Sequence, residues 1–177
     1  MTFSPNCSGI LKDPKFIVAH YTASGNFITT RDRLLNKESK VSAHYLIGRA
    51  GEIAQLVPLN KCAWHAGESE WKGYKGLNKY SIGIELVSFG PLVLKDGKFY
   101  SAEYGTEVPA NEVHDGAPST STYRYWQTFT EPQLAQLRAT IDELKRLYPS
   151  ITEVIGHRDC APKRKQDPWP LDLSAFQ

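Results

Sequence analysis

The chain has 177 residues, a formal net charge of +2 and 23% charged residues. This length fits one domain with a single core, and a charge this close to neutral, without a clustered basic face, predicts no nucleic-acid partner. No stretch approaches the roughly 18 apolar residues of a membrane span, and the first residues lack a basic and apolar leader, so we expect a chain that is cytoplasmic as synthesised. Its three cysteines show no CxxC spacing, which favours a reducing compartment.

Short apolar runs and turn residues indicate the elements of the first half of the chain. The pattern predicts three strands, over residues 15–19, 41–48 and 52–57. The first of them stops at His20, and its unbroken apolar run is typical of a strand buried on both faces. A helix is expected over about 29–38, with Leu34 and Leu35 turned inward. The polar stretch 68–79 predicts a surface loop.

In the second half, residues 81–87 predict another buried strand, and the glycine inside it, Gly83, indicates a close approach of another group to the backbone. Asp96-Gly97 is a two-residue hairpin signal. The remainder of segment 91–127 contains Pro109, Gly116 and Pro118 and is expected to be mostly irregular.

Regular structure is predicted to return at Thr130. The sequence 130–133, Thr-Glu-Pro-Gln, reads as a capping box with proline in the first turn, followed by leucines and isoleucines at helical spacing. A last short strand covers 154–155. Strands separated by helices predict an α/β fold in one domain, 1–177, with a mixed central sheet, flanking helices and an irregular insertion at about 91–127.

Two histidines, His20 and His157, follow directly on buried strands, and the mouths of α/β sheets collect ligands and catalytic groups. Two imidazoles and one carboxylate or thiolate make an open zinc site with a position left for water. Asp159, Cys160 and Asp167 are all candidates for the third ligand. The alternative is that each histidine is a hydrogen-bonded structural residue, and spacing alone does not decide between the two.

Five blocks of sequence, in order, carry a resemblance to a known family. They are Val18–Ala23, Val41–Ile47, Ala63–Gly67, Ser81–Leu86 and His157–Pro168. With these blocks the chain resembles the N-acetylmuramoyl-L-alanine amidases, a family that includes anhydro-muropeptide recycling enzymes, phage lysozyme-type amidases (endolysins) and animal peptidoglycan-recognition proteins.

The resemblance implies a zinc site with His20, His157 and Asp167 as ligands and the strand ends as its location. It also implies a catalytic role for Glu85 as proton shuttle and for Lys165 as oxyanion stabiliser. Without the resemblance, Glu85 could pair with a lysine and Lys165 could belong to a solvated basic face. The phage branch has a catalytic tyrosine where this chain has Ala43, so no such tyrosine is expected.

Three further residues are candidates for contact with substrate: His44, Trp64 and His65. For His44 a hydrogen-bonded core histidine is an equal alternative, and for Trp64 so is core packing. The tyrosines and the tryptophan of segment 91–127 could form a lid or a wall of the groove, or only elaborate the surface.

The implied activity is zinc-dependent hydrolysis of the amide between N-acetylmuramic acid, or its anhydro form, and L-alanine. The expected partner is therefore the peptidoglycan sacculus or its soluble fragments, and the sequence does not decide between them, nor does it give the oligomeric state. The alternative is a recognition module that binds peptidoglycan without cutting it. An unrelated zinc peptidase has no support, because no HExxH motif is present.

Overall fold

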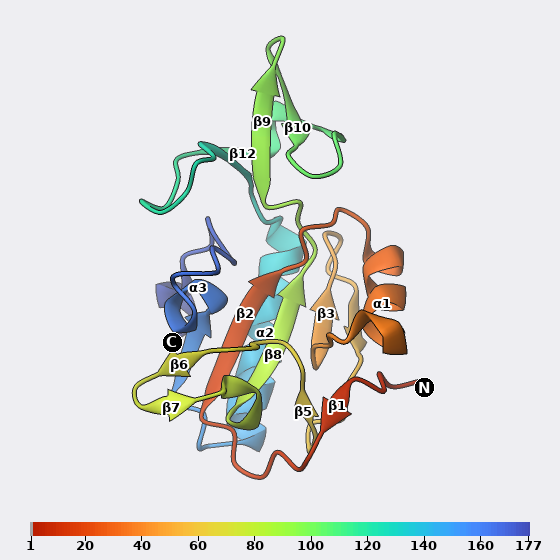
Figure 1. The fold of residues 1–177 in the computed structure, drawn as a ribbon, viewed down its shortest axis with the longest axis vertical. Helices are drawn as coiled ribbons and strands as arrows, with labels where there is room; N and C mark the ends of the chain where they lie inside the picture. The colour runs from red at the N-terminus through yellow and green to blue at the C-terminus, as the bar shows by residue number, and fades with distance from the viewer. Residues whose placement is uncertain (1) are drawn as a thin grey trace.

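The computed structural model describes residues 2–177, and its centre is a five-stranded sheet in the order β14-β2-β8-β3-β4 (Figure 1). These strands are β2 (Phe16–Tyr21), β3 (Tyr45–Ile47), β4 (Ile53–Gln55), β8 (Ser81–Leu86) and β14 (Glu153–Gly156). Strands β14, β2, β8 and β3 run parallel to one another, and β4 pairs with β3 antiparallel. The predicted mixed sheet in an α/β fold is confirmed.

The two central strands divide their side chains between two environments. Ile17 and Ala19 of β2, like Ile82 and Ile84 of β8, pack into the main core. That core also contains one face of helix α2 (Glu131–Leu147), which lies along the sheet in Figure 1. Because alternate residues of a strand point to opposite faces, the residues between them are directed to the other side of the sheet. That other side carries the candidate site.

Helix α2 begins at Thr130, whose side chain accepts a hydrogen bond from the backbone of Gln133. The predicted capping box is only half formed. The side chain of Gln133 is fully buried and donates instead to the carbonyls of Ile47 and Val87, which lie at the ends of β3 and β8. The glutamine therefore fastens the helix to the sheet rather than to its own N-terminus.

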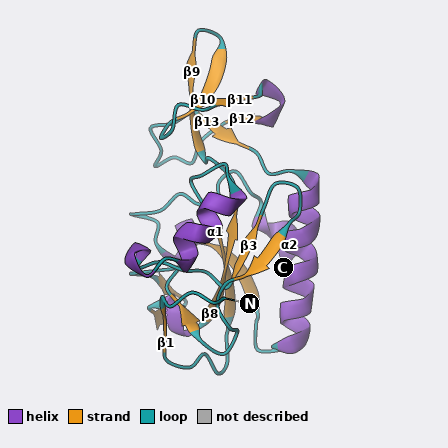
Figure 2. Ribbon diagram, turned by 90° about the vertical axis from the view of Figure 1, so that its right-hand side faces the viewer, coloured by secondary structure: helices purple, strands orange, loops and turns teal. Residues whose placement is uncertain are grey.

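Helix α1 (Phe27–Leu35) lies on the face of the sheet opposite α2 (Figure 2). Asn26 caps it by accepting a hydrogen bond from the backbone of Thr29. Leu34 is buried against Leu46 and Val87. One turn of this helix thus borders the candidate site.

The remaining elements around the central sheet are short. They are β1 (Cys7–Ser8), β5 (Cys62–Ala63), β6 (Glu70–Trp71), β7 (Tyr74–Lys75), α3 (His157–Cys160) and the 3-10 turns Lys37–Ser39, Leu77–Lys79, Ala110–Glu112 and Leu173–Phe176. Among residues 2–177, no helix combines the length and the apolar character needed to cross a bilayer.

The expectation that segment 91–127 is mostly irregular was wrong. It forms a second sheet, in the order β11-β10-β9-β13-β12, that projects from the end of the molecule (Figure 1). Its strands are β9 (Pro91–Lys95), β10 (Lys98–Ser101), β11 (Glu107–Val108), β12 (Val113–Asp115) and β13 (Tyr125–Gln127). The hairpin predicted at Asp96-Gly97 is confirmed, with positive φ at both residues.

The second sheet escaped the sequence analysis because its strands are too short to show a period of two. Its first and last strands pair with each other, Tyr125 opposite Leu92, which is a contact between distant parts of the segment. Trp126 is fully buried at this junction, with its ring centroid 6.1 Å from that of Tyr21 on the main sheet. Non-local pairs of this kind leave no local signal.

Candidate active site

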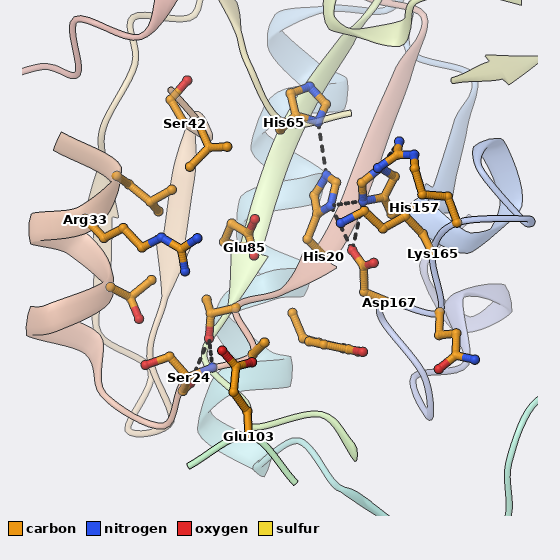
Figure 3. A pocket seen from close by; sticks show the side chains of 18 of the residues that line it. His20, Ser24, Arg33, Ser42, His65, Glu85, Glu103, His157, Lys165 and Asp167 are labelled. Carbon is orange, nitrogen blue, oxygen red and sulfur yellow. Dashed lines mark hydrogen bonds and ion pairs between the residues drawn. The ribbon is translucent and has the colours of Figure 1, made fainter. Parts of the chain in front are cut away.

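The carboxyl ends of the parallel strands bring the candidate residues together. His20 on β2 lies opposite Glu85 on β8 in register, and His157 follows β14 as the first residue of α3. Asp167 comes from the segment after α3, which is fastened to α3 by a hydrogen bond of 2.8 Å from the backbone of Arg158 to the carbonyl of Asp167. Figure 3 shows these side chains converging.

Three ligand-type atoms meet at one point. His20 Nδ1 lies 3.0 Å from His157 Nδ1 and 3.0 Å from Asp167 Oδ2, and His157 Nδ1 lies 3.1 Å from the same carboxylate oxygen. All three side chains are buried. Among residues 2–177, they are the one group of histidine, cysteine and carboxylate side chains whose geometry could hold a metal ion.

The outer nitrogen of each imidazole has its own partner. His157 Nε2 lies 3.0 Å from the carbonyl of Ala66, so it must donate, and His157 Nδ1 then carries a lone pair when the ring is neutral. His20 Nε2 lies 3.0 Å from His65 Nδ1, and His65 Nε2 lies 3.3 Å from the hydroxyl of Ser81. If His65 Nε2 donates to the hydroxyl of Ser81, His65 Nδ1 accepts a hydrogen bond from His20 Nε2. The Nδ1 atom of a neutral His20 then also carries a lone pair.

Two lone pairs and a carboxylate within about 3 Å of one another repel unless a cation lies between them. Burial lowers the pKa of His20 to about 4, although Asp167 opposes this shift. Burial also acts to raise the pKa of Asp167, but the close contacts with His157 and His20 hold that pKa below its ordinary range. Neutral imidazoles and an ionised carboxylate are what a zinc ion binds, so this donor set fits one.

Gly83 explains how His65 reaches this position. A Cβ on Gly83 would lie 2.4 Å from the imidazole of His65, so a side chain there would displace the ring. The close approach predicted at this glycine is confirmed. Along β8, Ser81, Gly83 and Glu85 all face the site, because they alternate with the core isoleucines.

Glu85 lies beside the cluster with one carboxylate oxygen, Oε2, buried and without a hydrogen-bond partner among the described residues. Burial, with the neighbouring charge of Asp167, raises the pKa of Glu85 to about 8, against the opposing charges of Lys165 and Arg33. A carboxyl that lines a pocket and whose pKa is raised toward neutrality is suited to exchange protons with a bound molecule.

The pocket in front of these residues has a volume of about 860 Å³. Lys165 lines it and extends along its wall toward the cluster (Figure 3). Trp64 and His65, both predicted to contact substrate, also line it. The indole of Trp64 donates a hydrogen bond of 3.1 Å to Ser8.

His44 lies apart from the other predicted site residues. It is 0% exposed, does not line the pocket, and has both ring nitrogens paired. His44 Nε2 lies 2.9 Å from the carbonyl of Lys61, and its Nδ1 accepts from the backbone of Gly83 at 3.0 Å. This geometry corresponds to the core-histidine alternative, and we propose a structural role for His44 in place of substrate contact.

The other two candidates for the third ligand do not join the cluster. Cys160 lies within hydrogen-bonding distance of the carbonyl of His157, and burial raises the pKa of its thiol to about 12. Asp159 accepts a hydrogen bond of 2.7 Å from the backbone of Gly156 at the start of α3. Both side chains therefore serve the local structure.

Sequence reasoning missed Arg33 on α1 and Glu103 on the second sheet's side, which also line the pocket. Arg33 had a weak signal, since it stands one helical turn after Thr29, which also lines the pocket. Glu103 had none, because its position depends on how the second sheet docks. Tyr104, one of the tyrosines expected to form a lid or a wall of the groove, does line the pocket.

The family model for N-acetylmuramoyl-L-alanine amidases matches residues 11–170. The chain belongs to this family. It is 38% identical over 140 residues to the 1,6-anhydro-N-acetylmuramyl-L-alanine amidase AmpD of Escherichia coli, a match that covers 78% of this chain and 57% of AmpD. The chain thus spans about half the length of the curated relatives it matches.

Two solved structures of the family contain substrate-related ligands. One is the Escherichia coli amidase AmiD in complex with anhydro-N-acetylmuramic acid-L-Ala-D-γ-Glu-L-Lys, at 30% identity and a TM-score of 0.65, over 93% of this chain and 53% of that one. The other is AmpDh3 of Pseudomonas aeruginosa with an anhydromuramic pentapeptide, at 29% identity and a TM-score of 0.68, over 93% and 59%.

Proposed function

We propose that the chain hydrolyses the amide bond between N-acetylmuramic acid, or its anhydro form, and L-alanine in peptidoglycan or its fragments. The observation that carries the proposal is the convergence of His20, His157 and Asp167 beside the unpartnered carboxylate oxygen of Glu85. Membership of the amidase family supports it. A module that only binds peptidoglycan would need neither a complete ligand set nor a buried proton-exchanging group.

In this proposal the three residues hold zinc, which when bound polarises the scissile carbonyl and lowers the pKa of a water molecule. Glu85 accepts the proton of the attacking water at its carboxylate and delivers it to the departing alanine nitrogen. That delivery is necessary because an unprotonated amide nitrogen is a poor leaving group. A carboxyl whose pKa lies near 8 can both accept and donate at neutral pH.

Lys165 has the second role. Its ammonium group extends toward the cluster, where the carbonyl oxygen acquires negative charge as the tetrahedral intermediate forms (Figure 3). A positioned cation stabilises that charge in the transition state more than in the ground state. Arg164, its neighbour, cannot take this role, because it donates to the carbonyls of Ala66 and Glu68.

The activity is tested by incubating the zinc-loaded protein with soluble anhydro-muropeptide and, separately, with intact sacculi. Release of peptide that a chelator abolishes and zinc restores supports the proposal. Binding to either material without release, in the presence of zinc, would instead support the recognition module. The ratio of the two rates decides between a recycling enzyme that acts in the cytoplasm and a lytic enzyme that acts on the wall.

A further inference from the structure

Arg33 is a cation in the pocket that neither the fold nor the proposed chemistry uses. It lies in the last turn of α1, lines the pocket, and directs its guanidinium toward Glu85 across the open space (Figure 3). No carboxylate among residues 2–177 forms an ion pair with it, and its side chain makes no hydrogen bond to a described residue. An arginine with five free donors in a pocket is suited to bind a planar anion.

The other cations of the pocket have other tasks or positions. Arg164 is held by backbone carbonyls, and Lys165 extends toward the cluster from the wall opposite α1. Lys163 lines the pocket from the same segment as these two residues. On the α1 side the pocket is lined by hydroxyl groups of Thr29, Thr30 and Ser42, which are uncharged. Arg33 is therefore the charged group that an anion on this side of the pocket would meet.

The substrate class supplies such an anion close to the scissile bond. In a stem peptide that begins L-Ala-D-γ-Glu, as in the ligand of the AmiD complex, glutamate continues the chain through its side chain and leaves its α-carboxylate free. Bond geometry puts this carboxylate roughly 7 Å from the scissile carbonyl carbon, so it stays inside the pocket when that carbonyl is at the cluster. It is the first charged group along the peptide.

We propose that Arg33 binds the free α-carboxylate of the second stem residue and thereby makes the enzyme selective for stem peptides that are not amidated at this position. The inference rests on the proposed amidase function. It assigns a direction to the pocket, in which the peptide leaves the cluster toward α1. The guanidinium of an arginine donates two parallel hydrogen bonds to a carboxylate. A carboxamide has only one oxygen to accept a hydrogen bond, and its NH2 group faces the second guanidinium donor with another donor.

The experiment uses two synthetic substrates, N-acetylmuramoyl-L-Ala-D-γ-Glu-L-Lys with either a free α-carboxylate or an α-carboxamide. The wild-type enzyme should prefer the carboxylate by about tenfold in kcat/KM, which is the lower range for a charge-assisted pair that solvent reaches. Arg33→Gln should lose about that factor on the carboxylate and less than about twofold on the carboxamide, while Arg33→Lys should regain part of it.

Arg31→Gln is the matched control, because Arg31 stands on the same helix, pairs with Asp32 and does not line the pocket. It should leave both rates unchanged. The unfolding temperature of Arg33→Gln shows whether this variant folds. If it folds, either an equal loss of rate on both substrates or no loss on either one overturns the proposal.

Binding of the product tripeptide L-Ala-D-γ-Glu-L-Lys, measured by calorimetry, tests Arg33 without turnover. If wild type binds the tripeptide and Arg33→Gln binds it about tenfold more weakly, the carboxylate site stands even when neither substrate is cleaved. That result would contradict the proposed amidase function alone. Equal affinities of the two proteins would contradict the carboxylate site alone.

Discussion

Gly83 is the residue at which the smallest change should disturb the site most. A methyl group there would press against the ring of His65 at 2.4 Å, and that ring holds the outer nitrogen of His20. We predict that Gly83→Ala lowers zinc affinity by roughly 10- to 100-fold, as loss of an outer-sphere partner does. Metal competition with a chelating dye measures this.

The double variant provides the control for Gly83. His65→Ala alone should also weaken zinc binding, but it removes the ring that the new methyl would strike. Adding Gly83→Ala to His65→Ala should therefore cost little more. If the losses of zinc affinity from the two substitutions add up in the double variant, Gly83 is needed for the conformation of the strand and not for space around the imidazole.

Glu85 carries the proposed proton transfer, and Glu85→Gln isolates this role because the amide keeps the size of the side chain but cannot accept the proton. We predict an unchanged zinc content and a kcat lower by roughly 10²–10⁴, the range for general acid–base catalysis. Loss of metal or an earlier thermal transition would instead identify Glu85 as a structural residue.

Lys165→Ala separates the oxyanion role from a solvated basic face. Zinc content and substrate affinity should be retained, while kcat falls by roughly 10²–10³, the usual effect of removing one donor to the oxyanion. Lys12→Ala is the matched control, since this exposed lysine does not line the pocket. Equal and small effects of the two changes would show that Lys165 belongs to a solvated basic face and has no oxyanion role.

At the scale of elements, the attachment of α2 to the sheet depends on one polar side chain. Gln133 donates to the carbonyls of Ile47 and Val87 from a fully buried position. Gln133→Leu would leave both strand-end carbonyls without their side-chain donor, and we predict a loss of about 2 kcal/mol in the free energy of unfolding. Gln136→Leu, one turn along the same helix, should change it by less than about 0.5 kcal/mol.

The elements also show what a sequence can and cannot predict. The positions of His20 and His157 near the carboxyl ends of buried strands and the tight approach at Gly83 follow from local runs of residues and were predictable. The strand expected to stop before His20 continues through it to Tyr21. Gln133 was assigned to its own helix cap, because its real partners lie 86 and 46 residues away. The second sheet and the position of Arg33 were missed for the same reason, since both depend on contacts between distant segments.

At the scale of the whole molecule, the buried histidines should make stability depend on pH. Burial lowers the pKa of His44 to about 4, against the opposing hydrogen bond to Lys61. The stability that its neutral form contributes is fully present above about pH 6.5, its unfolded value, and is lost as the pH falls toward 4. We predict a loss of roughly 2 kcal/mol from His44 alone between pH 6.5 and 5.

Denaturant unfolding of the chelated protein at several pH values measures this dependence. His44→Asn keeps a polar side chain that does not titrate, so its free energy of unfolding should fall less steeply than that of wild type. Parallel slopes would mean that the pKa of His44 is the same in the folded and the unfolded protein. Because His44 lies outside the cluster, the comparison is not affected by the loss of metal.

The order of the chain has a consequence for how the protein is made. His20 and His157 are separated by 137 positions, and Asp167 comes ten residues later. A ribosome that has released only the first two thirds of the domain has therefore produced β2 with His20, but neither β14 nor the other two ligands of the cluster. Closing so long a loop is slow, and it must precede any tight capture of the ion. During biosynthesis, the metal would thus be acquired after translation of the domain rather than serve as a nucleus for its folding.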